Sequence, residues 1–193
     1  LFFIMPQGID ASEFIPSCFL PSKLDSSEVT IFGGSFNPWH EGHSECLRQC
    51  AQYEDNILLV PDYSPWKDNR NDGPLKNLIS LSNKTDQRFA IYPGFWAKED
   101  RNPTESWICD VRAQKINWLM GDDTFMHLMK WDNIQKVLAR LSKVYVVPRE
   151  HRNHEAQELK SVHKQVLALN SALEVIYLED HPFRGVSSSG IRS

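Results

Sequence analysis

The sequence has no apolar run long enough to cross a bilayer, so no membrane partner is expected. It has only four cysteines and no C-x-x-C pair; Cys46 and Cys50 are predicted to be small core residues on a helix, and we expect a reduced, cytoplasmic location. It also lacks an excess of basic residues. A net charge of −4 argues against a general nucleic-acid surface, although a small polyanion could still bind in a locally basic pocket.

What the sequence does contain is an alternation of apolar strands and helices. Residues 1–28 carry three prolines and are predicted to form an irregular N-terminal arm, followed by one domain over residues 29–193. Predicted strands cover 29–34, 56–61, 88–93, 116–121, 143–148 and 173–178, and predicted helices cover 41–53, 124–141 and 154–169. This alternation indicates a doubly wound α/β domain with a mainly parallel sheet, whose ligands bind at the carboxyl ends of the strands.

The run IFGGSFNPWHEGH, residues 31–43, lies at such a strand end. Its two glycines allow the backbone to approach a ligand closely. His40 and His43 follow at a predicted helix start, where free N–H groups and the helix dipole favour an anion. A zinc site of the H-E-x-x-H kind would need histidine at Ser44, and the dinucleotide fingerprint G-x-G-x-x-G is absent. The alternative of two ordinary helix histidines is less consistent with the whole block.

Two motifs together resemble a known superfamily. GGSFNPWHEGH is similar to the signature G-G-[ST]-F-[DN]-P-x-H-x-G-H of the adenylyltransferase branch of the HIGH nucleotidyltransferases. VSSSGIRS, residues 186–193, resembles the I-S-S-T-x-I-R element of that superfamily. The resemblance implies a Rossmann-like nucleotidyltransferase fold.

Four intermediate segments resemble the nicotinate-nucleotide adenylyltransferases in particular. They are LLVPDYSPWK (58–67), SWICDV (106–111), INWLMGDDTFMHLMKWDN (116–133) and VYVVPR (144–149). The chain departs from that family's pattern at Ile108 and Val111, where threonines are usual, and at Asp122, where a small residue is usual. Asn37 instead resembles the motif of eukaryotic nicotinamide-type enzymes.

The resemblance implies that ATP and nicotinate mononucleotide react to give nicotinate adenine dinucleotide and pyrophosphate, a step of NAD biosynthesis. Mg²⁺ is expected to accompany ATP, held largely by phosphates and water. Two alternatives stay open: the same chemistry with nicotinamide mononucleotide or another phosphate acceptor, and a catalytically weakened nucleotide-binding protein. Self-association into a homo-oligomer is also left open.

The resemblance also assigns roles to individual residues. His40, His43 and Arg192 are the predicted catalytic residues, which contact the ATP phosphates. The predicted ATP-binding residues lie in the glycine turn and in the C-terminal motif: Gly33, Gly34, Ser35, Phe36, Ser187, Ser188 and Ser189. The predicted acceptor-binding residues are Lys67, Trp107, Asp110, Asp123 and Trp131. Core packing for Trp131, a helix N-cap for Asp123 and a solvated loop position for Lys67 are the alternatives.

Overall fold

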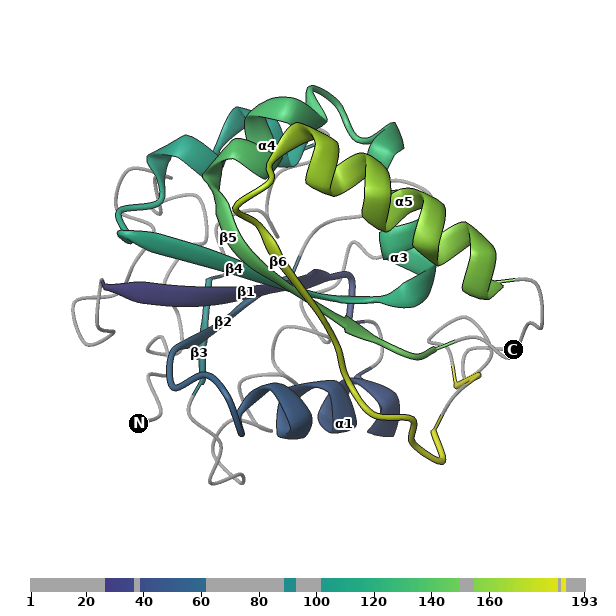
Figure 1. The fold of residues 1–193 in the computed structure, drawn as a ribbon. Helices are drawn as coiled ribbons and strands as arrows, with labels where there is room; N and C mark the ends of the chain where they lie inside the picture. Colours follow the sequence, from purple (N-terminus) through teal and green to yellow (C-terminus); the bar gives the residue numbers. More distant parts are fainter. Residues whose placement is uncertain are drawn as a thin grey trace.

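A computed structural model describes residues 27–36, 39–61, 89–92, 102–149, 155–183 and 185–186. Its centre is a six-stranded sheet in the order β3-β2-β1-β4-β5-β6, in which all neighbouring strands are parallel (Figure 1). The strands are β1 (Glu28–Gly34), β2 (Ile57–Pro61), β3 (Phe89–Ile91), β4 (Lys115–Gly121), β5 (Leu141–Val147) and β6 (Glu174–Tyr177). The predicted parallel, doubly wound sheet is confirmed.

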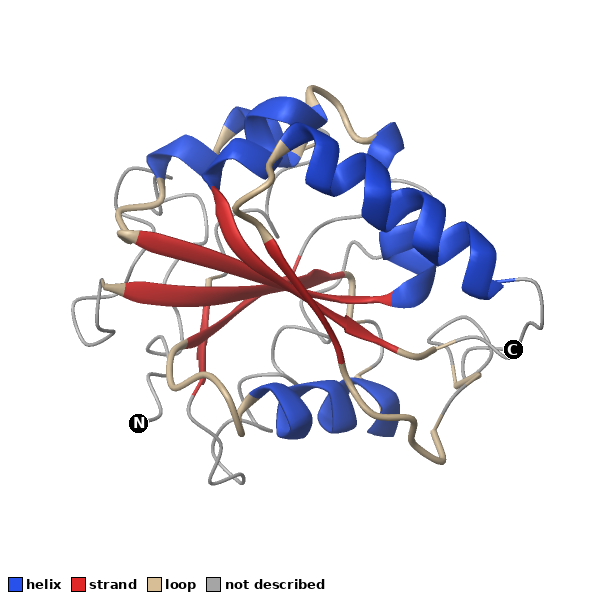
Figure 2. Ribbon diagram, viewed as in Figure 1, coloured by secondary structure: helices blue, strands red, loops and turns tan. Residues whose placement is uncertain are grey.

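Helices cover both faces of this sheet. Helix α1 (Glu41–Cys50) lies on one face, and α3 (Asp122–Met126), α4 (Ile134–Arg140) and α5 (Glu155–Leu169) lie on the other (Figure 2). Because both faces are covered, the central strands are apolar almost throughout, and two core clusters form, one on each side of the sheet. One contains Leu47 of α1 with Leu59 and Leu119, and the other contains Ile31 and Val144.

The strand order places a topological switch point between β1 and β4. From β1 the chain winds outward to β2 and β3, then returns to β4 and winds the other way to β5 and β6. Ligands of open α/β sheets bind beyond the carboxyl ends of the strands at such a point. Gly34 ends β1 and Gly121 ends β4, so these two glycines mark the edge at which a ligand is expected.

The predicted helix over residues 124–141 is wrong. The structure has three short pieces there: α3, the 3-10 helix η5 (Leu128–Lys130) and α4. Trp131 is extended, with ψ 145°, and Asn133 takes the left-handed conformation, with φ 43°. Asparagine tolerates that conformation better than most residues, so W-D-N acts as a turn within an apparently helical apolar pattern. Strand β5 then begins at Leu141, directly after α4.

The other element predictions differ from the structure only at their ends. Helix α1 ends at Cys50, and residues 51–53 form a turn. The predicted arm falls mostly outside the described residues, and β1 already begins at Glu28. Among the helices that the structure describes, none is long and apolar enough to span a membrane.

Candidate active site

The two glycines that end β1 face opposite sides of the sheet. A Cβ on Gly33 would lie 3.4 Å from Cζ2 of Trp118, on the side of α4. A Cβ on Gly34 would lie 3.1 Å from the ring of Phe36, on the side of α1. Phe36 is buried and has a positive φ of 46°, which turns the chain sharply after β1. The absence of a side chain at these two positions therefore leaves room for the ring of Trp118 on one face and the ring of Phe36 on the other.

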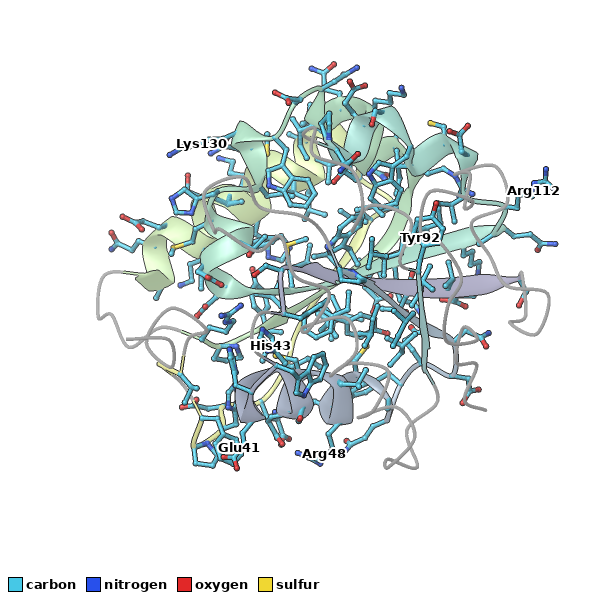
Figure 3. The ribbon with its side chains drawn as sticks, turned by 180° about the vertical axis from the view of Figure 1, so that it is seen from behind. Glu41, His43, Arg48, Tyr92, Arg112 and Lys130 are labelled. Atoms are coloured by element: carbon cyan, nitrogen blue, oxygen red, sulfur yellow. The ribbon has the colours of Figure 1, made fainter. Side chains whose placement is uncertain are left out.

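Helix α1 begins at this edge with two stacked imidazoles. The rings of His40 and His43 lie 3.7 Å apart at an interplanar angle of 24°, and Figure 3 shows His43 in the first turn of α1. The backbone N–H of His40 donates to Nδ1 of His43 at 3.2 Å. Because Nδ1 accepts this bond, the neutral His43 ring carries its proton on Nε2, which makes Nε2 a hydrogen-bond donor.

The His40 ring is buried, and within the described residues neither of its nitrogens has a hydrogen-bond partner. Burial, and secondarily the charge of Arg149, lower the pKa of His40 to about 4. Gly42 gives this ring its space, because a Cβ there would lie 3.0 Å from Cε1 and Nδ1 of His40. Buried polar groups in native proteins are normally hydrogen-bonded, so these nitrogens indicate a ligand with oxygen atoms at this position.

The start of α3 adds two carboxylates to the site, and the segment after β5 adds the guanidinium of Arg149. Asp123 lies in the first turn of α3, and its Oδ1 is 4.0 Å from Nε of Arg149. The N-cap of α3 is Gly121, so Asp123 is not the N-cap. The neighbouring Asp122 is buried and accepts hydrogen bonds from the backbone of Asp123 and Arg149, at 2.8 and 2.9 Å.

Arg149 is the site residue that our sequence analysis did not single out. Its guanidinium is near enough to His40 to affect the pKa of that ring, and its carbonyl oxygen accepts a hydrogen bond from the N–H of Gly185 at 2.7 Å. The signal for it was present, because VYVVPR places an arginine just after the carboxyl end of a predicted strand. Structural data were needed to show that this strand end lies beside α1.

Three tryptophans pack together on the opposite side of β1 from α1. The ring of Trp118 lies 5.8 Å from that of Trp107 and 5.5 Å from that of Trp131, the latter pair edge to face. Trp107 is 4% exposed, and its indole N–H donates to the carbonyl of Asn102. Trp131 is partly buried against the same core, so it retains an accessible part that Trp107 lacks. Asp110 is exposed at the end of a 3-10 helix.

Five predicted site residues lie outside the described residues: Lys67, Ser187, Ser188, Ser189 and Arg192. The described segment that precedes the last four leads toward the site. Both amide atoms of Gln49 in α1 bond the backbone of Glu179, at 2.9 and 3.0 Å, and Gly185 bonds Arg149. Figure 1 shows the chain passing from β6 to the side of α1.

The described residues contain no group of three or more His, Cys, Asp or Glu side chains that could hold a metal ion. Asp122 and Asp123 lie at the start of α3, but Asp122 is engaged by two backbone N–H groups.

A sequence profile of the cytidylyltransferase-like proteins matches residues 31–193, which is most of the chain. The chain belongs to this family. It is a nucleotidyltransferase, and the family resemblance of its motifs is confirmed. The match begins in β1 and spans the glycine turn, the histidine pair and Arg149.

The related proteins that match this chain are named as adenylyltransferases. A probable nicotinate-nucleotide adenylyltransferase of Caldicellulosiruptor saccharolyticus is 24% identical over 177 residues, covering 86% of this chain and 85% of its own. One of Leptospira interrogans is 26% identical over 181 residues, covering 88% and 86%. Among solved structures, the Plasmodium falciparum nicotinic acid mononucleotide adenylyltransferase complexed with NaAD is 15% identical, with a TM-score of 0.67, covering 86% of this chain and 82% of that one. This likeness supports the fold.

Proposed function

We propose that this nucleotidyltransferase transfers the adenylyl group of ATP to nicotinate mononucleotide, giving nicotinate adenine dinucleotide and pyrophosphate in NAD biosynthesis. The observation that carries the proposal is the stacked pair His40 and His43 at the start of α1, beside the glycine turn and Arg149. The pair offers hydrogen-bond donors to phosphate oxygens at a helix N-terminus, which itself favours anions. The names of the related enzymes support the choice of acceptor.

The proposed reaction needs no protein nucleophile. An oxygen of the acceptor phosphate attacks the α-phosphorus of ATP, a new P–O bond forms, and the bond to the β-phosphate oxygen breaks to release pyrophosphate. The acceptor phosphate is already largely ionised at neutral pH, since its second pKa is about 6. Catalysis then rests on alignment and on stabilising the charge that develops on the α-phosphate.

His43 is the proposed donor to the α-phosphate, through Nε2, because its Nδ1 is held by the backbone of His40. His40 supplies a second donor through the ring nitrogen that carries its proton, because neither nitrogen has a hydrogen-bond partner among the described residues. We assign Ser187, Ser188, Ser189 and Arg192 to the β- and γ-phosphates and Gly33, Gly34, Ser35 and Phe36 to the nucleotide, as the motifs imply.

We assign the acceptor to the tryptophan side of β1. Trp131 is the proposed stacking partner of the pyridine ring, with Trp118 behind it, and Lys67 the partner of the acceptor phosphate. Trp107 and Asp110 complete the assignment from the motif. We assign Asp123 to the acceptor ribose, because its Oδ1 has no hydrogen-bond partner among the described residues. The Mg²⁺ that enters with ATP would neutralise phosphate charge and would be held largely by the phosphates and water.

One observation favours a second acceptor. Asn37 matches the nicotinamide-type motif, so nicotinamide mononucleotide is the competing substrate. Pyrophosphate release should be followed with Mg-ATP and each mononucleotide separately. Turnover with nicotinate mononucleotide supports the proposal, turnover with nicotinamide mononucleotide alone replaces the acceptor, and ATP binding without release with either mononucleotide supports the weakened nucleotide-binding protein.

His43→Ala tests the mechanism within the same assay. Removing a preorganised donor to developing negative charge is expected to lower kcat by about 100- to 1000-fold. His163→Ala is the matched control, because His163 lies on α5 and bonds the hydroxyl of Tyr177, away from the glycine turn. Equal activity of the two variants would contradict the proposed role of His43.

A further inference from the structure

Asp122 is a buried carboxylate with no assigned role in the proposed reaction. It is 4% exposed, and one of its oxygens, Oδ1, accepts two backbone hydrogen bonds. One comes from Asp123 in the first turn of α3 and the other from Arg149 after β5. A single atom therefore joins the carboxyl end of β4 to the carboxyl end of β5, two segments that are 27 residues apart in the chain.

The backbone of Arg149 is held from both sides. Its N–H donates to Asp122 at 2.9 Å, and its carbonyl oxygen accepts from the N–H of Gly185 at 2.7 Å. Its side chain then passes over the end of β4 at Gly121, where a Cβ would overlap Cδ of Arg149 and Oδ1 of Asp123. Gly121 and Asp122 together thus determine where the guanidinium lies.

There the guanidinium lies near two other side chains of the site, those of Asp123 and His40. Asp123 Oδ1 is 4.0 Å from its Nε, and its charge acts on the ring of His40, which stacks on His43. The side chain is 28% exposed, so it remains partly accessible to a ligand. Arginine presents a planar fork of donors that suits phosphate oxygens.

We propose that Asp122 is a positioning residue that holds Arg149 beside the histidine pair so that its guanidinium binds the phosphates of ATP. The inference deepens the proposed function and rests on it for the identity of the anion. Asp122 stands at a position where the family that the motifs resemble usually has a small residue.

Two substitutions separate the hydrogen bonds of Asp122 from its charge. Asp122→Asn keeps an oxygen that accepts both bonds, whereas Asp122→Ala removes the acceptor. The dissociation constant of Mg-ATP, measured by calorimetry, is expected to rise about tenfold in the alanine variant relative to the asparagine variant. The pKa of His40, followed by NMR titration of its ring proton, should be higher in Asp122→Ala than in Asp122→Asn, because Arg149 no longer lies close to it.

A background without the guanidinium completes the test. In Arg149→Met, the asparagine and alanine variants should have the same ATP affinity and the same His40 pKa, because nothing is left to position. Leu173→Ala, in the core after α5, is the control for a general loss of stability and should leave both quantities unchanged. If Asp122→Ala does not fold, Asp122→Ser takes its place and is compared with Asp122→Asn, both with Arg149 present and in the Arg149→Met background.

Equal ATP affinity and equal His40 pKa in the asparagine and alanine variants would overturn the inference. A difference that persists in the Arg149→Met background would overturn it as well, since Asp122 would then act without Arg149. Both readouts work without turnover. Absence of pyrophosphate release by the wild-type protein would therefore refute the proposed reaction without deciding the role of Asp122.

Discussion

At the scale of single residues, the burial of His40 makes the stability of the protein depend on pH. Its pKa is lowered to about 4, mainly by burial and secondarily by Arg149, from an ordinary value of 6.5. Below pH 6.5 the unfolded chain binds a proton at His40 that the folded chain does not bind. Stability is therefore full above pH 6.5 and is lost as the pH falls toward 4.

The expected loss from this one ring is about 2 kcal/mol of unfolding free energy between pH 7 and pH 5. Denaturant unfolding of the wild type and of His40→Gln at both values measures it, and the contributions of the other histidines cancel in the comparison. The variant should lose less stability over this interval. If wild type and His40→Gln lost the same stability between pH 7 and pH 5, His40 would accept a proton as readily in the folded protein as in the unfolded chain.

At the same scale, some neighbours in the site could be predicted from the sequence and others could not. His40, His43 and the two glycines lie within one short motif, so their common function could be inferred from spacing alone. Asp122 and Arg149 come together only because β4 and β5 are neighbours in the sheet. Trp107 was expected at the acceptor, yet its burial against Trp118 depends on packing that a motif does not reveal.

At the scale of elements, the W-D-N turn between η5 and α4 is a test of local backbone strain. Asn133 has φ 43° and ψ 51° at the N-cap of α4, and its side chain makes no capping hydrogen bond. The apolar pattern of residues 124–141 resembled one helix because Leu128 and Ile134 are both buried on the same core. Periodicity detects the buried face, but it does not detect a left-handed residue within it.

Asn133→Gly should leave the unfolding free energy unchanged or slightly higher, because glycine adopts this conformation without steric cost. Asn133→Ala should lower it by about 1 kcal/mol, because alanine resists a positive φ. Urea unfolding of both variants measures the difference. If alanine were as stable as glycine, residues 131–134 would not hold the turn, and a continuous helix would again be the better description.

At the scale of the whole molecule, the charged groups of the site and those of a second network lie at opposite ends of the strands. The carboxyl edge carries the histidines and Arg149, and the other edge carries a network that joins the starts of β1, β4 and β5. There Lys143 Nζ lies 3.2 Å from Glu28 and 3.1 Å from Glu54, while Asn117 donates to Glu28 at 2.9 Å. Alternating strands predicted the sheet, but this network depends on strand order, which the pattern of apolar residues does not specify.

The network should make the sheet sensitive to acid. The hydrogen bond from Asn117 lowers the pKa of Glu28 most strongly, with Lys143 contributing and burial opposing. A carboxyl whose folded pKa lies below its ordinary 4.5 stabilises the fold above that value, and this contribution is lost as the pH falls through the lowered pKa. Wild type should therefore lose more stability than Glu28→Gln between pH 5 and about pH 3 in denaturant titrations. Parallel curves for the two proteins would mean that Glu28 is no better stabilised as an anion in the sheet than in the unfolded chain.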